Sequence, residues 1–450
     1  MKRVRSVFPV IIKYFTMPKT KKVQAKKTAS KKTLADFFRV ADGMADILPK
    51  DEAWWREIWR AGFSISECHN FHFIETPVIE RLDLFVNGAD GVNGDIKKRL
   101  FVFSLKKGER VVLRPGGILP ILRSYVEHHL GYFSSPLKVF SYGPMFRRHP
   151  GVDEVAVSHE WGFQIIGDND PVYDIQSITV VLDFLKSLKI KNTTLKINTN
   201  GCRVCRKSYQ EKLKNYYAGA KSDLCSRCAR MAEKDIASVF MCKEEGCVAV
   251  KECAPIILDY LCQSCNNHLK VLLELIEDNG ILYEPDPYLI NDFDGFNRMI
   301  FSIRSASGIE LARGGRYDYL LEAIGGRQIP GVGSLLLAEN VIIAMQEQAG
   351  LRTRNKPKVF FIAVGDQAKK ASVRHMSLLR SNGVVVIEML GKKSLKTQLK
   401  FAEKTKTPIT LLLGQKEVFE ESLIMRDMET GAQETIVAAE VVDRVKKKFK

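Results

Sequence analysis

The chain has 450 residues, of which 45% are hydrophobic and 27% are charged, and its formal net charge is +17. This composition is typical of a globular protein, and no apolar run reaches the roughly 18 residues that a membrane-spanning helix needs. The length predicts two or three domains, each large enough to bury a core.

The positive charge is concentrated at the two ends of the chain. Residues 1–35 contain eleven Lys or Arg and no acid, and the last five residues include four lysines. Residues 1–35 are too polar to bury a core and are expected to form a disordered basic tail. Such a tail is either simply solvated or attracts the phosphates of a nucleic acid.

An export signal is not expected at the N-terminus. The apolar stretch Val7–Ile12 is short, contains Pro9 and ends at Lys13, and no small-residue cleavage site follows. We therefore expect a cytoplasmic protein with no membrane partner, and its true start is either Met1 or Met17.

Helix and strand patterns alternate along most of the chain. Acidic residues followed by helically spaced apolar residues predict a helix within residues 46–70, and residues 71–85 are expected to form a strand broken at Pro77. Two long strands are expected at 137–149 and 158–167. After a linker, residues 355–450 repeat strand and helix, which predicts a small α/β domain with a mainly parallel sheet.

The cysteines are confined to one segment. Nine of the ten lie between Cys202 and Cys265, in a chain without an export signal, so metal ligation is favoured over disulfides. The spacing of Cys202, Cys205, Cys225 and Cys228 is CxxC–x19–CxxC, typical of a tetrahedral zinc site. A second set comprises Cys242, Cys247, Cys262 and Cys265, with Cys253 as a competing ligand. Four thiolates leave no open position, so these sites are interpreted as structural.

The order of several motifs resembles the histidyl-tRNA synthetase family, which belongs to the class II aminoacyl-tRNA synthetases. "GMADILP" is similar to the family's GTKDILP, "FIETPVIERLDLF" to motif 1, "LRPGG" to LRPEG, and "YGPMFRRH" to the start of motif 2. "GGRYDYLLEAIGG" resembles the family's glycine-rich histidine-pocket segment, and residues 355–450 resemble its anticodon-binding domain. The likeness covers residues 36–450.

The resemblance implies an α+β fold with an antiparallel class II sheet of six or seven strands. The implied domains are a core at 36–200 and 269–348, a cysteine-rich zinc-knuckle helical insertion at 201–268, and a C-terminal anticodon-binding-type α/β domain at 355–450. It also implies a homodimer with tRNA or another RNA as partner. In the family reaction the carboxylate of histidine attacks the α-phosphate of ATP, and the tRNA end then takes the amino acid. Arginines and magnesium neutralise the charge that develops.

The active-site motifs depart from the family at several positions. Asn291 and Asn340 stand where the resemblance places two arginines, the second of which holds the γ-phosphate of ATP. Glu160 replaces a glutamine and Gln164 a glutamate, and Gly116 and Ile118 replace a glutamate and a threonine. No catalytic residue is assigned. The remnants of the nucleotide and amino-acid pocket are Arg114, Gly116, Gly117, Ile118, Arg147, Glu160, Gln164, Gly314, Gly315 and Arg316.

Arg147 is expected to hold the α-phosphate and the histidine carboxylate. Arg316 has an alternative role, pairing with Asp318 or Glu322.

The leading hypothesis is a synthetase-like protein, catalytically impaired or inactive, that binds tRNA or related RNA. The alternatives are a divergent active histidine–tRNA ligase, which would use histidine, ATP and magnesium, and a regulatory synthetase-like subunit. The last usually lacks the anticodon-binding domain, so residues 355–450 argue against it.

Overall fold

The computed structural model describes residues 38–41, 43–87, 100–106, 108–148, 157–232, 239–240, 242–289, 295–348, 358–391 and 394–449. The chain divides into two compact units, Met1–Ala349 and Gly350–Lys450, which are described separately. The basic tail and Asn291 lie outside the described residues. None of the helices in the described part is both long and apolar enough to cross a membrane.

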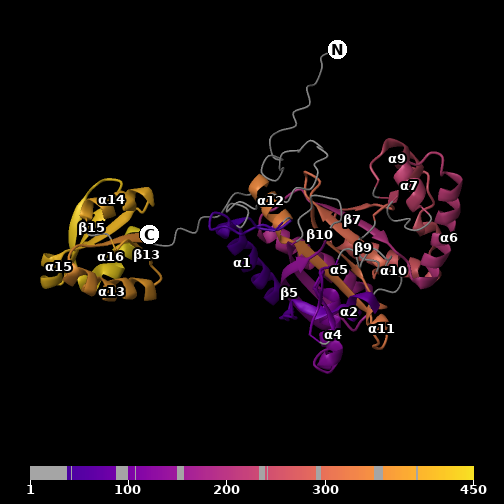
Figure 1. Ribbon diagram of the computed structural model, residues 1–450, viewed down its shortest axis with the longest axis horizontal. Coiled ribbons are helices and arrows are strands. Elements are labelled where there is room, and N and C mark those ends of the chain that lie inside the picture. The colour runs from indigo at the N-terminus through magenta and orange to yellow at the C-terminus, as the bar shows by residue number, and fades with distance from the viewer. Residues whose placement is uncertain are drawn as a thin grey trace, which may run out of the picture. The chain divides into compact units, whose positions relative to one another are not determined.

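The first unit is built on an eight-stranded sheet, in place of the six or seven strands expected (Figure 1). Its inner pairs are antiparallel, and only the two edge pairs, β1 with β5 and β7 with β8, are parallel. The strands in spatial order are β1 (His72–Phe73), β5 (Leu137–Phe146), β6 (Val157–Ile166), β11 (Gly331–Leu337), β10 (Glu310–Arg316), β9 (Asn297–Arg304), β7 (Thr194–Thr199) and β8 (Tyr283–Pro285).

Both faces of this sheet bury apolar side chains, because successive residues of a strand point to opposite sides. On one face Trp161, Phe163 and Phe301 pack against helices α1 (Glu52–Cys68), α5 (Pro171–Ser187), α10 (Gln263–Asp278) and α12 (Ala338–Gln348). On the other face Val139 and Ile300 pack against a second set of elements. These are α2 (Leu82–Asn87), α4 (Ile118–Glu127), α11 (Leu320–Ala323) and a small sheet of β2 (Ile79–Arg81), β4 (Arg110–Leu113) and β3 (Val102–Ser104).

The expected strand at residues 71–85 is only partly confirmed. Two short strands, β1 and β2, flank Pro77, but residues 82–87 form helix α2. Leu82 and Phe85 are both buried and are three residues apart, which is the spacing of one helix face. The apolar residues of this stretch therefore meet the core as a helix.

The cysteine-rich insertion is helical and has its own small core. The helices in its described residues are α6 (Arg203–Gly219), α7 (Ser226–Met231), α9 (Glu245–Glu252) and the 3-10 turn η4 (Ile257–Tyr260), after which α10 returns the chain to the sheet. Leu213, Tyr217 and Val250 pack against buried cysteines. The apolar area is small, so a metal is expected to contribute to its folding.

The second unit has a five-stranded sheet in the order β13-β12-β14-β15-β16. Its strands are β12 (Lys358–Ala363), β13 (Val385–Glu388), β14 (Ile409–Leu413), β15 (Ser422–Asp427) and β16 (Gln433–Val437). The first three are parallel, and β15 and β16 add an antiparallel hairpin. The helices are α13 (Asp366–Ser381), α14 (Leu395–Lys404), α15 (Gln415–Phe419) and α16 (Val441–Lys448).

Candidate functional site

Strand β6 carries two of the expected pocket residues on one face. Glu160 and Gln164 are four residues apart, so they project from the same side of the strand. Gly143 of β5 lies opposite Glu160, and Gly333 of β11 lies opposite Gln164. The missing side chains leave room above the sheet for long polar groups.

Arg147, directly after β5, is bound by a carboxylate of the protein itself. Its Nη2 donates to Glu160 Oε1 at 2.6 Å, and only 3% of the Glu160 side chain is exposed. Gly116 lies beside the same guanidinium, since a Cβ at that position would be 3.8 Å from Nη2. Charge-assisted pairs of this length are strong. The cation expected to hold an anionic ligand is therefore already paired.

The other residues of the "LRPGG" segment connect elements of the fold. Arg114 is buried and donates from Nη1 to Thr76 O at 2.8 Å and from Nε to Pro144 O at 3.2 Å. Burial lowers its pKa. Gly117 is the N-cap of α4, and Ile118 is the first residue of that helix. Arg114 thus ties the segment before β2 to β5.

Gln164 is held by hydrogen bonding and by close packing. The Tyr317 hydroxyl donates to Gln164 Oε1 at 2.6 Å. Burial raises the pKa of Tyr317, so its hydroxyl stays protonated and remains a donor. Any side chain at Gly333 would overlap Gln164 Oε1. Gln164 is therefore part of the packed wall of the pocket.

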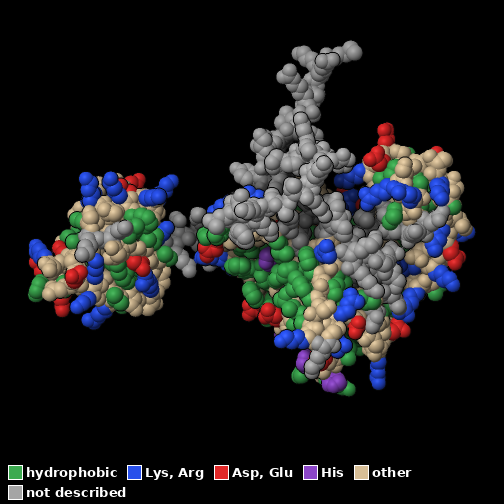
Figure 2. Space-filling model, viewed as in Figure 1, with side chains coloured by type: hydrophobic (Ala, Val, Ile, Leu, Met, Phe, Trp, Pro, Cys, Tyr) green, Lys and Arg blue, Asp and Glu red, His purple; other side chains and the backbone are tan. Residues whose placement is uncertain are grey.

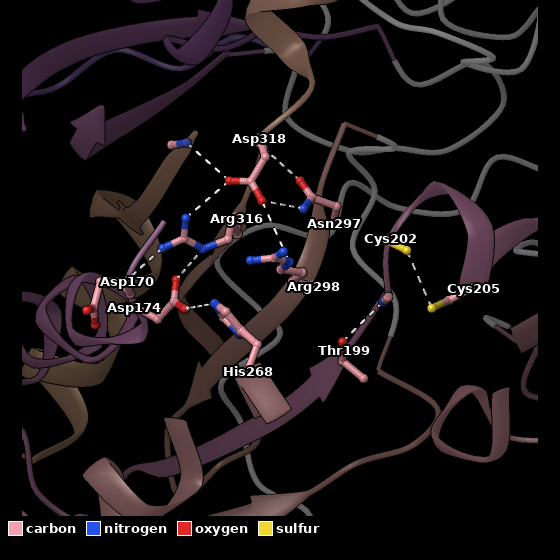
Figure 3. A network of polar contacts seen from close by, with 12 residues as sticks. Asp170, Asp174, Thr199, Cys202, Cys205, His268, Asn297, Arg298, Arg316 and Asp318 are labelled. Carbon is pink, nitrogen blue, oxygen red and sulfur yellow. Dashed lines mark hydrogen bonds and ion pairs between the residues drawn. The ribbon is translucent and has the colours of Figure 1, made fainter. Parts of the chain in front are cut away.

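Arg316 is fully buried at the centre of a polar network (Figure 3). Its Nε donates to Asp174 Oδ1 at 2.9 Å, and its Nη1 donates to Asp318 Oδ1 at 3.1 Å. Burial opposes its charge, but Asp174 and Asp318 outweigh that effect and raise its pKa. The expected pairing with Asp318 is confirmed, whereas Glu322 pairs with Arg203 at 2.9 Å. Arg316 acts as an internal cross-link between β10 and α5.

Gly314 and Gly315 are required by packing within the sheet. A Cβ at Gly314 would lie 2.5 Å from both Gly333 O and the Phe301 ring, and a Cβ at Gly315 would lie 2.9 Å from Phe296. These distances are too short for any side chain. Glycine is therefore needed at both positions so that neighbouring parts of the sheet can pack closely, and not so that a ligand can approach.

Asn340 supplies no charge at the start of α12. Its Nδ2 donates to the main-chain oxygen of Glu310 at 2.8 Å. The neighbouring Glu339 accepts from the His159 backbone N–H at 3.0 Å and lies 2.7 Å from His159 Nδ1. Both side chains are thus engaged with adjacent strands.

Three network residues were not singled out from the sequence: Asp174, His268 and Asn297. His268 Nε2 lies 3.0 Å from Asp174 Oδ2, and Asn297 donates from Nδ2 to Asp318 Oδ2 at 2.7 Å. A signal was present for two of them. Asp174 is a carboxylate on the apolar face of "PVYDIQSITVVLDF", and His268 follows Cys265 by one helical turn.

The eight candidate ligands form two groups of four thiols, each with its Sγ atoms within 4.8 Å of one another. Site 1 comprises Cys202, Cys205, Cys262 and Cys265, and site 2 comprises Cys225, Cys228, Cys242 and Cys247. The expected grouping of Cys202, Cys205, Cys225 and Cys228 is therefore wrong, as is that of the other four. The 17-residue helix α6, about 25 Å long, begins at the first CxxC pair and runs most of the way to the next one along the chain. The exposed Cys253 belongs to neither group.

The geometry of both groups suits a tetrahedral ion. Zn–S bonds of about 2.3 Å place tetrahedral sulfurs about 3.8 Å apart, and Cys202 Sγ lies 3.6 Å from Cys205 Sγ and 3.9 Å from Cys262 Sγ. The first cysteine of each CxxC pair is the N-cap of a helix, where backbone amides favour a thiolate.

One thiol of each group ionises more easily than usual, whereas burial raises the pKa of Cys205, Cys228, Cys247 and Cys265. In site 1, burial opposes ionisation of Cys202, but the N–H and thiol of Cys205 lower its pKa to about 7. In site 2, the N–H and thiol of Cys228 lower the pKa of Cys225 to about 7. Backbone N–H groups also donate to Cys205 Sγ at 3.1 Å and to Cys247 Sγ at 3.2 Å.

Comparison with known proteins agrees with this architecture. Residues 43–341 match the family model described as histidyl-tRNA synthetase, and residues 358–448 match an anticodon binding domain. Histidine–tRNA ligase of Halothermothrix orenii is 33% identical over 411 residues, covering 90% of this chain and 98% of that protein. The corresponding protein of Natranaerobius thermophilus is 30% identical over 410 residues, covering 90% and 97%.

Among solved structures, apo histidyl-tRNA synthetase of S. aureus superimposes with a TM-score of 0.74 at 27% sequence identity. The match covers 91% of this chain and all of that one. The core sheet and the C-terminal domain are therefore both found in that structure.

Proposed function

The chain belongs to the histidyl-tRNA synthetase family, and we propose that it is a synthetase-like protein that binds tRNA or a related RNA but forms little or no histidyl-adenylate. The observation that carries the proposal is the Arg147–Glu160 pair at 2.6 Å. Forming the adenylate brings the histidine carboxylate and the phosphates of ATP together, so free cations are essential.

The resemblance implies ligand-binding arginines at positions 147, 291 and 340, and only the first of these is an arginine here, paired with a carboxylate. Asn291 and Asn340 stand at the other two positions, and Glu160 neutralises Arg147. An ATP phosphate approaching Arg147 would have to displace Glu160 or lie beside its charge, which costs about 4 kcal/mol at 4 Å and an effective dielectric constant of 20. ATP, magnesium and histidine are therefore ligands only under the alternative hypothesis.

The alternative hypothesis is a divergent, active histidine–tRNA ligase. The two family matches, to residues 43–341 and 358–448, favour it because they cover both parts of the chain. The anticodon-binding match also argues against a regulatory subunit, since such subunits usually lack this domain. We favour RNA binding without adenylation because the changes converge on one pocket while the RNA-binding domain is retained.

The C-terminal unit has a surface suited to RNA. Lys396, Lys400 and Lys404 are exposed and four residues apart, so they form a row on one face of α14. Such a row can follow a phosphate backbone. We place this RNA-binding protein in the cytoplasm.

Filter binding of the full-length protein to total tRNA tests the proposal. Replacing the three α14 lysines with alanine should weaken binding and lower the salt dependence, by up to about 0.7–0.9 in slope for each lost phosphate contact. A matched control replaces Lys186, Lys270 and Lys416, which lie on other helices, with alanine. Absence of tRNA binding by the wild-type protein would contradict the proposal.

We also propose that sites 1 and 2 each hold a structural zinc ion. Cys202, Cys205, Cys262 and Cys265 would hold one, and Cys225, Cys228, Cys242 and Cys247 the other. Zinc bound by four thiolates has no open position for substrate, so it would stabilise the insertion without taking part in a reaction.

A homodimer is the assembly that the exposed apolar surface favours. Phe63 of α1 and Phe73 of β1 are 52% and 53% exposed, and their ring centroids are 6.3 Å apart. Figure 2 shows hydrophobic side chains gathered over this part of the first unit. Large exposed patches of this kind mark association surfaces. Sedimentation analysis of Phe73→Asp, with Leu282→Asp as control, should show a monomer for the first variant alone.

A further inference from the structure

Metal site 1 is attached directly to the end of β7 and the start of β9. Only Asn200 and Gly201 separate β7 from Cys202. The N–H of Asn200 donates to Arg298 O at 2.7 Å, and the N–H of Arg298 donates to Gly201 O at 2.8 Å. Cys202 of site 1 therefore directly follows a backbone segment, residues 200–201, that is hydrogen-bonded to β9.

The first turn of α6 contacts the same region. Arg206 donates from Nη1 to Phe296 O at 3.4 Å. Arg203 lies 4.2 Å from the centre of the Tyr319 ring and pairs with Glu322 at 2.9 Å. The Cys202–Cys205 turn is thus anchored on both β9 and the segment after β10.

The other half of site 1 reaches this region through α10. Cys262 is the N-cap of that helix, and Cys265 and His268 follow on one face at a spacing of three residues. His268 is buried, and its Nε2 lies 3.0 Å from Asp174 Oδ2. Asp174 in turn accepts from Arg316. Helix α10 therefore links the Cys262–Cys265 pair to β10 through His268, whose contact with Asp174, and that of Asp174 with Arg316, are shown in Figure 3.

These two paths meet at residues 296–298 and 316–318, which we call the pocket wall because Tyr317 donates to Gln164 of the pocket. Asp318 accepts from Asn297 Nδ2 at 2.7 Å, and its backbone N–H donates to Asn297 Oδ1 at 2.7 Å. Arg298 Nε lies 4.0 Å from Asp318 Oδ2. An ion at site 1 would join the two CxxC pairs and so close a ring of contacts around this wall.

Site 2 has different surroundings. Its buried thiols, Cys228 and Cys247, pack with residues of the insertion itself, including Leu213, Tyr217 and Val250. The described packing and hydrogen bonds of these two thiols lie within residues 209–254. Loss of an ion from site 2 should therefore disturb the outer part of the insertion and leave the sheet intact.

We propose that the ion at site 1 positions the pocket wall, residues 296–298 and 316–318, through the Gly201–Arg298 pairing and the His268–Asp174–Arg316 path. Site 2 has no such role. The inference rests on the zinc occupancy proposed above. It assigns His268 as a positioning residue, since it acts through Asp174 and does not touch a ligand of the pocket.

Hydrogen exchange of the full-length, zinc-loaded protein tests this directly, with matched variants Cys205→Ser and Cys228→Ser. Each removes the buried second cysteine of a CxxC pair. Cys205→Ser should lose one zinc per chain and exchange about tenfold faster over residues 295–318, because local opening becomes easier. Cys228→Ser should lose one zinc and exchange faster over 209–254 only. Equal behaviour of 295–318 in the two variants would overturn the proposal.

His268→Gln keeps the inference testable if Cys205→Ser does not fold. This variant retains all eight thiols, so it should keep two zinc ions and still exchange faster over 295–318. Unchanged exchange in His268→Gln with both zinc ions bound would contradict the positioning path. Zinc content separates this failure from that of the metal proposal, because wild-type protein with fewer than two zinc ions contradicts the occupancy itself.

Discussion

The pocket face of the sheet and the cysteine insertion satisfy their polar groups in opposite ways. In the pocket, Arg147 has Glu160, Arg316 has two aspartates, and Asn340 has a main-chain oxygen. In the insertion, eight thiols form two groups of four whose natural partner is an ion from outside the chain. These cations of the pocket are paired within the chain, whereas the two thiol groups have the arrangement of metal sites.

This difference distinguishes the fold that the chain shares with its family from the ligands that we propose it binds. A site that neutralises its own cations gains little from an anionic ligand. A group of four thiols, by contrast, provides strong affinity for zinc and depends on it for stability. On the proposal made above, the pocket keeps the fold of its family without its ligands, while the two cysteine groups still bind zinc.

Removal of zinc should produce the largest effect. Structural zinc contributes about 10 kcal/mol or more of apparent binding free energy at each site, more than any single substitution considered below. A strong chelator should release two zinc ions per chain and reduce the helical circular dichroism from α6, α7 and α9. Full helicity in the metal-free protein would show that the insertion, like the pocket, keeps its structure without a ligand. It would contradict the difference drawn between the two regions.

Arg316→Met tests whether the pocket network is structural. It leaves Asp174 and Asp318 buried without their cation, which should lower the free energy of unfolding by about 3–5 kcal/mol. The tryptophans at 54, 55, 59 and 161 all lie in the first unit, so urea unfolding followed by their fluorescence reports that unit.

Arg60→Met is the control for this variant. Arg60 pairs with Glu57 at 2.6 Å on an exposed face of α1, so its loss should change the unfolding free energy by less than about 1 kcal/mol. Similar losses in the two variants would mean that the buried network has no special role.

Glu160→Gln should have a smaller effect, on binding rather than on stability. It frees Arg147 while keeping the side-chain shape, and we expect the affinity for ATP with magnesium to rise about tenfold, equivalent to about 1.4 kcal/mol. Isothermal titration calorimetry measures the change. Glu310→Gln is the matched control, because Glu310 lies 3.7 Å from Arg313 and not beside Arg147. Equal gains in both variants would show a general charge effect and not release of Arg147.

Much of the fold follows from local pattern. The amphipathic stretch ending at Cys68, the long strand pair β5 and β6, and the alternation in the C-terminal unit were all predictable because each depends on its own periodicity. Residues 82–85 were predicted as the end of a strand, and the burial of Leu82 and Phe85 on one face instead favours helix α2. The parallel pairs at the two edges of the sheet, β1 with β5 and β7 with β8, also join residues that are far apart in the sequence.

The site was less predictable because its contacts are long-range. The spacing of Cys202, Cys205, Cys225 and Cys228 matched a zinc site, but the length and direction of α6 bring Cys262 and Cys265 to the first pair instead. Arg316 was expected at the pocket, and its partner Asp174 lies 142 residues earlier. Sequence spacing indicates which residues are candidates for a site. The path of the folded chain decides which of them come together.

The most direct test of the account is histidine-dependent exchange of pyrophosphate with ATP. The wild-type protein should be compared under identical conditions with the Halothermothrix orenii ligase, which is 33% identical. Each lost arginine contact is expected to cost roughly 10²–10³ in rate, so the account predicts exchange at least about 10⁴-fold slower than that of the ligase. Exchange within about tenfold of the ligase, equivalent to about 1.4 kcal/mol in barrier height, would contradict it.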